Sequence, residues 1–175
     1  MELRDQLLKE HSRANCDTIV YWIGNNQQRF DALFRLFLGQ EYRVVQHAAW
    51  PLSYTVINHP GLIKKHFNRL ISNLSKPGIH DAVKRNTMRL LQDIDLPVKY
   101  HGVIMDTCFR YIAQPGEAAA VKAFSLGVLE KLSGTYPEII PEIKLLIEEC
   151  YEREKPSFKS RAKNFLKRNE ENVEM

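Results

Sequence analysis

A ten-residue pattern occurs four times in this chain at nearly constant spacing. The copies read VVQHAAWPLS from Val44, AVKRNTMRLL from Ala82, AVKAFSLGVL from Ala120 and SFKSRAKNFL from Ser157. Successive copies begin 38, 38 and 37 residues apart. This period is long enough for two helices and two turns, and it is typical of proteins that stack one helical unit on the next.

Aligning the four copies produces columns of similar side chains. Two columns are apolar, and they contain Val45, Val83, Val121 and Phe158, and then Leu52, Leu90, Val128 and Phe165. A third column is small, with Ala49, Thr87, Ser125 and Ala162. The next position holds Trp50, Met88 and Leu126, but Lys163 in the last copy. Small side chains let helix backbones approach closely, so this column predicts packing between equivalent helices, and Lys163 indicates the end of the array.

The remainder of the chain also has the helical period. Segments of about 12 to 18 residues have apolar residues at i, i+3, i+4 and i+7. Glycine and proline separate them, for example in NHPG at 58–61, SKPG at 75–78 and GTYP at 134–137. Pro51 falls inside one segment, where we expect it to kink the helix. No segment keeps the alternation of a strand, so the sequence predicts an all-α protein.

The pattern V-[KQ]-x-x-[AST]-x-x-[LV], followed by a turn and a helix rich in leucine and isoleucine, resembles the HEAT repeat family of the armadillo-type class. The second helices lie in HPGLIKKHFNRLISNL, LPVKYHGVIMDTCFRYI and YPEIIPEIKLLIEECY. The resemblance covers nearly the whole chain. It implies a right-handed α-solenoid, an αα-superhelix, of about four to five helical hairpins in a single domain over 1–175. We expect a loose first unit at 1–40, repeats at about 41–78, 79–116 and 117–155, and a C-terminal capping helix at 156–170.

Composition and charge indicate the class of protein and its expected location in the cell. Hydrophobic residues make up 44% of the chain and charged residues 26%, as in ordinary folded domains. No run approaches the roughly 18 to 20 apolar residues that span a bilayer, so we expect no membrane insertion. The three widely spaced cysteines and the charged start MELRDQLLKEHSR favour a reducing, cytoplasmic location. After the basic last helix, the tail NEENVEM is acidic and is expected to fray.

The sequence contains no recognisable catalytic motif. Phosphate-binding loops, dinucleotide-binding loops, a G-x-S-x-G nucleophile motif and an H-E-x-x-H zinc motif are all absent. The six histidines show no metal-ligand spacing with each other or with cysteine. We therefore expect no metal and no cofactor, and we favour a protein that is not an enzyme.

One alternative involves catalysis. The chain is similar in repeat type to the HEAT-like DNA alkylation repair glycosylases, which grip duplex DNA on a basic concave surface and use aspartate, tryptophan and arginine there. The only tryptophans are Trp22 and Trp50, and Trp50 shares a column with core residues. A DNA-binding protein related to these glycosylases therefore stays as the alternative, and the net charge of +4 is compatible with a nucleic acid partner.

HEAT-type arrays usually bind partners on the concave surface formed by their second helices. The candidate partner-binding residues there are Arg35, Lys64, Lys65, Arg69, Lys99, His101 and Arg110. The last second helix is acidic instead, with Glu138, Glu142, Glu148, Glu149 and Glu152 against Lys144. A surface that runs from basic to acidic suits a protein or peptide with complementary charge. The resemblance and this polarity predict a non-enzymatic scaffold for protein–protein interaction.

Overall fold

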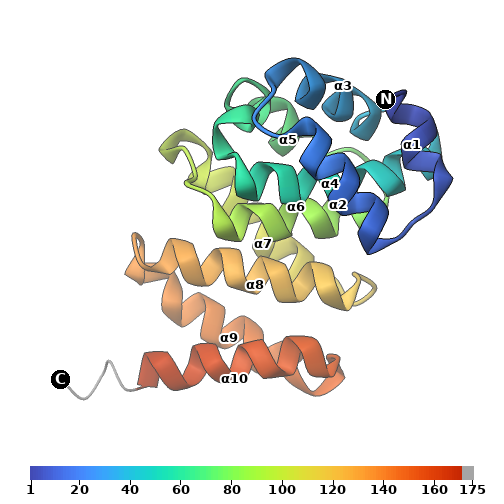
Figure 1. Cartoon of the computed structure of the whole chain (residues 1–175). Coiled ribbons are helices and arrows are strands. Elements are labelled where there is room, and N and C mark those ends of the chain that lie inside the picture. Colours follow the sequence, from blue (N-terminus) through green and yellow to red (C-terminus); the bar gives the residue numbers. More distant parts are fainter. Residues whose placement is uncertain (171–175) are drawn as a thin grey trace. The chain divides into compact units, whose positions relative to one another are not determined.

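The computed structural model describes residues 1–170, and within them it contains ten α-helices, four 3₁₀ helices and no strand (Figure 1). The prediction of an all-α repeat fold is confirmed. The chain divides into two compact units, Met1–Asp95 and Leu96–Met175. The division falls between two helices of the predicted repeat 79–116, and the prediction of one domain stays a prediction. The end of the acidic tail, 171–175, lies outside the described residues.

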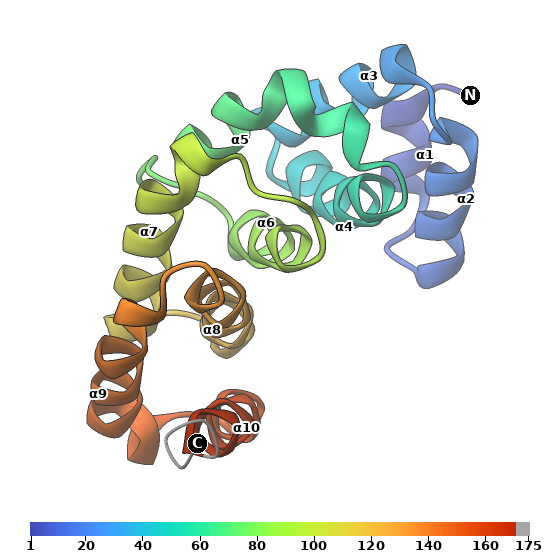
Figure 2. The ribbon, with the colours of Figure 1, turned by 90° about the vertical axis from the view of Figure 1, so that its left-hand side faces the viewer.

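Unit 1 is organised around one long central helix. Its elements are α1 (Leu3–Lys9), α2 (Arg13–Ile23), α3 (Gln27–Phe37), α4 (Tyr42–Asn58), η1 (Pro60–His66), α5 (Phe67–Asn73) and α6 (Asp81–Asp93). Helix α4 contacts α1, α2, α3, η1 and α6. Figure 2 shows α4 and α6 in one layer of this unit and α3 and α5 in the other. Pro51 is buried inside α4, which continues beyond it to Asn58.

Unit 2 repeats the same two-layer arrangement. Its elements are η2 (Val98–Tyr100), α7 (His101–Ala113), α8 (Ala119–Ser133), η3 (Pro137–Ile139), α9 (Ile140–Cys150), η4 (Tyr151–Arg153) and α10 (Pro156–Glu170). Helix α8 packs against both α7 and α10, and α9 contacts the same two helices. Figure 2 shows α8 and α10 in one layer of the unit and α7 and α9 in the other.

The repeated pattern forms the cores of these units. All eight residues of the two apolar columns are buried, the most exposed being Val45 at 8%. The small column is buried too, and Lys163 is exposed, as the sequence predicted. Trp50 differs from its column neighbours because it is only half-buried and lies beside the rings of His11 and Tyr54.

Candidate binding surfaces

Four of the predicted partner-binding residues lie on neighbouring elements of unit 1. Arg35 is on α3, Lys64 and Lys65 are on η1, and Arg69 is on α5. These four residues define what we call the α3–η1–α5 surface. A hydrogen bond of 3.0 Å from Gln27 Nε2 of α3 to the carbonyl of residue 62 links α3 to η1. The surface is therefore built on helices that are fixed to each other.

Asp31 of α3 is the carboxylate that pairs with Lys65 of this surface. Its oxygens accept from Lys65 Nζ at 2.5 Å, from His66 Nε2 at 2.7 Å and from Gln27 Nε2 at 2.9 Å. The His66 ring also stacks on Phe34, with 4.4 Å between centroids. Burial by itself would raise the pKa of Asp31, but the hydrogen bonds from Lys65, His66 and Gln27 hold that pKa well below its usual range. Asp31 is thus ionised at neutral pH, and its oxygens are already hydrogen-bonded within the protein.

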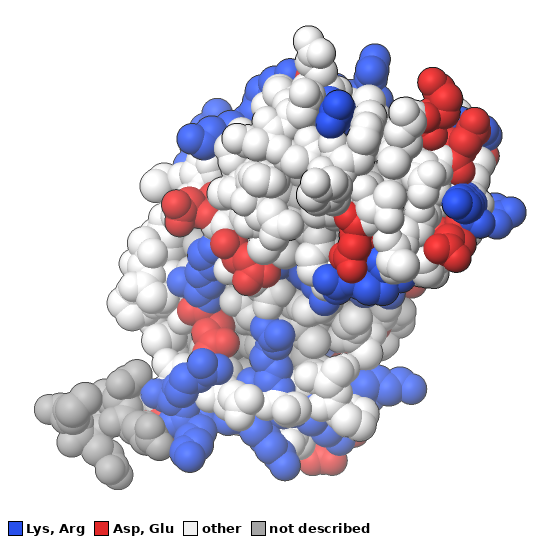
Figure 3. Space-filling view, viewed as in Figure 1, with Lys and Arg blue, Asp and Glu red and all other residues white. Residues whose placement is uncertain are grey.

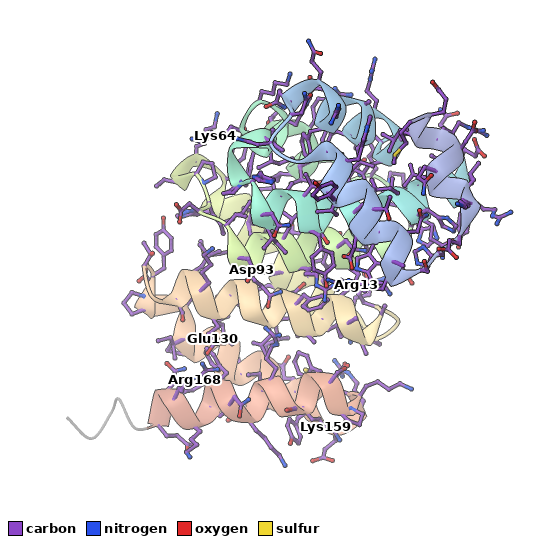
Figure 4. All side chains as sticks on the ribbon, viewed as in Figure 1. Arg13, Lys64, Asp93, Glu130, Lys159 and Arg168 are labelled. Carbon is purple, nitrogen blue, oxygen red and sulfur yellow. The ribbon has the colours of Figure 1, made fainter. Side chains whose placement is uncertain are left out.

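The other cations of the α3–η1–α5 surface have no carboxylate partner among residues 1–170. Arg35 and Lys64 are exposed and form no ion pair there. The Arg69 guanidinium lies 5.8 Å from the centre of the Phe34 ring. Lys and Arg side chains line the edge of unit 1 beside α3 and α5 in Figure 3, and Figure 4 labels Lys64 at this edge. The surface therefore has positive charge available to a partner.

The remaining three candidates lie in unit 2, and they differ from each other. Lys99 and Arg110 are exposed, 4.9 Å and 5.6 Å from the rings of Tyr100 and Tyr111. His101 is buried, with 7% of its surface exposed. Its Nε2 donates to the carbonyl of residue 96 at 2.8 Å, and its Nδ1 accepts from the hydroxyl of residue 136 at 3.0 Å. Both ring nitrogens are engaged, so His101 holds the start of α7 in place.

Sequence reasoning missed a second cluster of arginine and aromatic side chains. The Arg13 guanidinium of α2 lies 4.6 Å from the centre of the Tyr54 ring and donates to its hydroxyl at 3.1 Å. Arg89 of α6 approaches the same ring at 5.1 Å. We call these three residues the Tyr54 cluster; Arg13 is labelled in Figure 4, and Figure 3 shows a compact group of cationic side chains there. One feature of the sequence could have indicated this cluster. Tyr54 follows Trp50 by one helical turn, so the two aromatic residues lie on the same side of α4.

The three cysteines are all free and buried. Burial raises the pKa of the Cys16 thiol to about 12, and it also raises the pKa values of Cys108 and Cys150. None of these thiols is a thiolate nucleophile at neutral pH. Within residues 1–170, no three His, Cys, Asp or Glu side chains gather as a potential metal site, and no helix is both long enough and apolar enough to cross a membrane.

Comparison with known proteins supports the architecture. The family model described as HEAT repeat domain matches residues 3–169. Neither the search of curated proteins nor the search of solved structures gave a match. The match covers nearly the whole chain, including every copy of the repeated pattern and the helices that these copies form. The chain therefore belongs to the HEAT repeat domain family.

Proposed function

We propose that this protein is a non-enzymatic scaffold that binds an acidic segment of a protein or peptide partner on the α3–η1–α5 surface. One observation carries the proposal. Asp31 is satisfied by Lys65 and His66, while Arg35, Lys64 and Arg69 have no carboxylate partner among residues 1–170. An acidic segment would supply the missing anions.

The scaffold would act by presenting these cations on a fixed frame. The Asp31 hydrogen bonds and the stacking of His66 on Phe34 join α3 to η1, so little ordering is needed when a partner arrives. Exposed charges of this kind act mainly on orientation and association rate. Lys99 and Arg110 of unit 2 belong to the same proposal as a separate basic site, whereas the buried His101 does not.

The test measures binding of a fluorescent, glutamate-rich peptide by anisotropy at low and physiological salt. The triple variant Arg35→Glu, Lys64→Glu and Arg69→Glu is expected to weaken binding by at least about tenfold, because charge-assisted contacts are lost and repulsion is added. The matched control changes three exposed lysines at the C-terminal end of unit 2 to glutamate: Lys155, which precedes α10, and Lys163 and Lys167 of α10. Equal weakening in both variants would show that net charge alone drives binding, and the proposed surface would be wrong.

The DNA-binding alternative has one observation of its own. In the Tyr54 cluster two guanidinium groups lie near the ring of a half-buried tyrosine, although Arg13 is already paired with Asp17 at 2.9 Å. Cations beside an aromatic face suit both phosphate contact and base stacking. Its test is binding to a duplex of about 20 base pairs across a salt series. Tight binding that falls steeply with salt and is lost in Arg13→Glu with Arg89→Glu would replace the scaffold proposal. An unchanged affinity in that variant would remove this cluster as a DNA site.

A further inference from the structure

Unit 1 contains a cavity that the proposed function does not use. Its volume is about 430 Å³, within the usual range for small-molecule sites. It lies where the end of α3, the first turn of α4, the end of α5 and the start of α6 come together, and its lining includes Tyr42, Asn73, Lys76 and His80. None of the four residues that define the α3–η1–α5 surface lines it. The cavity is therefore a separate feature of the unit.

Asn73 and His80 are the most informative residues of the cavity. Only 7% of the Asn73 surface is exposed, and its side-chain amide has no hydrogen-bond partner within residues 1–170, although its amide atoms are not themselves fully buried. A fully buried polar atom usually has a partner, since leaving it unpaired costs about 1–3 kcal/mol. His80 Nε2, which belongs to the same lining, is such an atom: it is buried and has no hydrogen-bond partner within residues 1–170, and it therefore points to a polar group that enters the cavity from outside.

A cationic side chain and a helix N-terminus also border the cavity. It adjoins the N-terminus of α4, a helix of 17 residues, whose first N–H groups have no carbonyl one turn earlier. The N-cap residue Glu41 makes no side-chain cap and instead binds Arg4 at 2.7 and 2.9 Å. Lys76 is exposed, lines the cavity, and has no ion pair in the described part of the chain. These features favour an anion.

The remaining walls suit a flat or apolar group. The Tyr42 and His80 rings lie 4.2 Å apart between centroids, and Val45, Ile79 and Val83 supply aliphatic surface. His80 Nδ1 accepts from the backbone N–H of residue 82 at 2.9 Å, so the ring is held in one orientation. A ligand with a ring and an anionic end would match both kinds of lining.

We propose that this cavity binds a small organic anion. Its carboxylate or phosphate oxygens would meet His80 Nε2, the Asn73 amide, the Lys76 ammonium and the N-terminus of α4. Its ring would lie against Tyr42 and His80. The inference is independent of the scaffold function, because it concerns different residues and a different class of ligand.

The test uses the full chain labelled with ¹⁵N and three probes of similar size: benzoate, phenyl phosphate and the neutral benzamide. We expect benzoate or phenyl phosphate to bind with a dissociation constant of about 1 mM or lower and to shift the side-chain amide signal of Asn73. The stronger of these two probes identifies the anion class. Lys76→Gln should weaken that probe about tenfold, whereas Lys64→Gln, a change of the same kind on the α3–η1–α5 surface, should have no effect.

Several results would overturn the proposal. These are benzamide binding as tightly as both anions, signal changes confined to residues outside the cavity, or equal effects of Lys76→Gln and Lys64→Gln. Asn73→Leu provides a second variant, and it should weaken binding of the anion by removing one hydrogen bond. Should that variant fail to fold, Lys76→Gln still decides the question, because the Lys76 side chain is exposed and the fold does not depend on it.

Discussion

Lys122 and Glu154 form an ion pair inside unit 2. Lys122 Nζ lies 2.5 Å from Glu154 Oε1, and only 1% and 6% of the two side chains are exposed. Lys122 is on α8, and Glu154 lies just before Pro156, the first residue of α10. Removing two charges from water is costly, and this cost is offset only while both partners are present. The pair therefore fixes where the chain enters α10.

The first prediction follows from this burial. Lys122→Met should lower the free energy of unfolding by about 3–5 kcal/mol, because the buried Glu154 would keep only the exposed Arg153, 3.9 Å away, as a cationic partner. The double variant with Glu154→Leu should recover at least about 2 kcal/mol of that loss. Urea unfolding monitored by circular dichroism measures both. Lys84→Met is the control, since Lys84 occupies the same repeat position with a weaker partner at 3.6 Å. A double variant no more stable than Lys122→Met would contradict this account.

Asp31 gives a prediction with a defined pH dependence. Its lowered pKa means that the folded chain holds Asp31 ionised where the unfolded chain binds a proton. The stabilisation is complete above the ordinary aspartate pKa of about 3.9 and is lost as the pH falls toward the folded value. Asp31→Asn should cost about 1–2 kcal/mol at pH 7 and progressively less in acid. The measurement is urea unfolding at several pH values, with the exposed Asp93→Asn as control. If Asp31→Asn lost the same unfolding free energy at every pH, the predicted pH dependence would be wrong.

At the scale of an element, the small column determines how closely α8 and α10 pack. Ala162 of α10 is fully buried, and the next residue, Lys163, is exposed. Ala162→Leu should destabilise the protein by about 1–3 kcal/mol because the added methyl groups have no room between the helices. Lys163→Leu adds a leucine one position away and should change stability by less than about 0.5 kcal/mol. Thermal unfolding compares the two. Similar melting temperatures for the two variants would mean that α8 and α10 can move apart to accommodate the leucine without loss of stability.

Helix α6 depends on an unusual N-cap. His80 accepts from the N–H of residue 82 through Nδ1, which requires that nitrogen to be unprotonated. Burial lowers the pKa of His80, and Arg85 lowers it further against the opposing effect of Asp81. The folded chain thus binds fewer protons than the unfolded chain, so this stabilisation is present above about pH 6.5 and falls as the pH drops below it.

The prediction for this cap uses two substitutions. His80→Asn keeps an acceptor at the N-cap and should retain most of the stability while removing the part of its pH dependence that comes from residue 80. His80→Ala should lose about 1 kcal/mol at pH 7. Melting temperatures at pH 5 to 8 distinguish them. If the parent chain and the His80→Asn variant show the same pH dependence of stability, groups other than His80 control that dependence.

The helices and their cores could be predicted from the sequence, and most of the side-chain partners could not. The repeated columns fix which positions face inward, because the same position must pack against its neighbour in each unit. The contacts of His101, Lys122 and Tyr54 depend on residues 35, 32 and 41 positions away. Nothing in the local pattern distinguishes Lys122, which is buried, from Lys84. Such partners follow from tertiary packing, so the Tyr54 cluster and the cavity needed the structure.

At the scale of the whole molecule, the three buried thiols report on how the chain opens. Cys16 lies in unit 1, whereas Cys108 and Cys150 lie in unit 2. A thiol reagent reaches a buried cysteine only after the surrounding structure opens, so the labelling rate measures the free energy of that opening. In the native chain at neutral pH we expect all three to react at least about 10³-fold more slowly than in the unfolded chain.

Variants that keep one cysteine, with the other two changed to alanine, test the prediction of a single domain. If residues 1–175 unfold as one cooperative domain, Cys16 and Cys108 should report the same opening free energy, and urea should lower both with the same slope. Each variant's own stability, measured by circular dichroism, corrects for the substitutions. A lower opening free energy and a smaller slope at one site would show that its unit opens alone. Cooperativity would then end between α6 and α7, inside a predicted repeat, because neighbouring units of a repeat protein are coupled only through their shared interfaces.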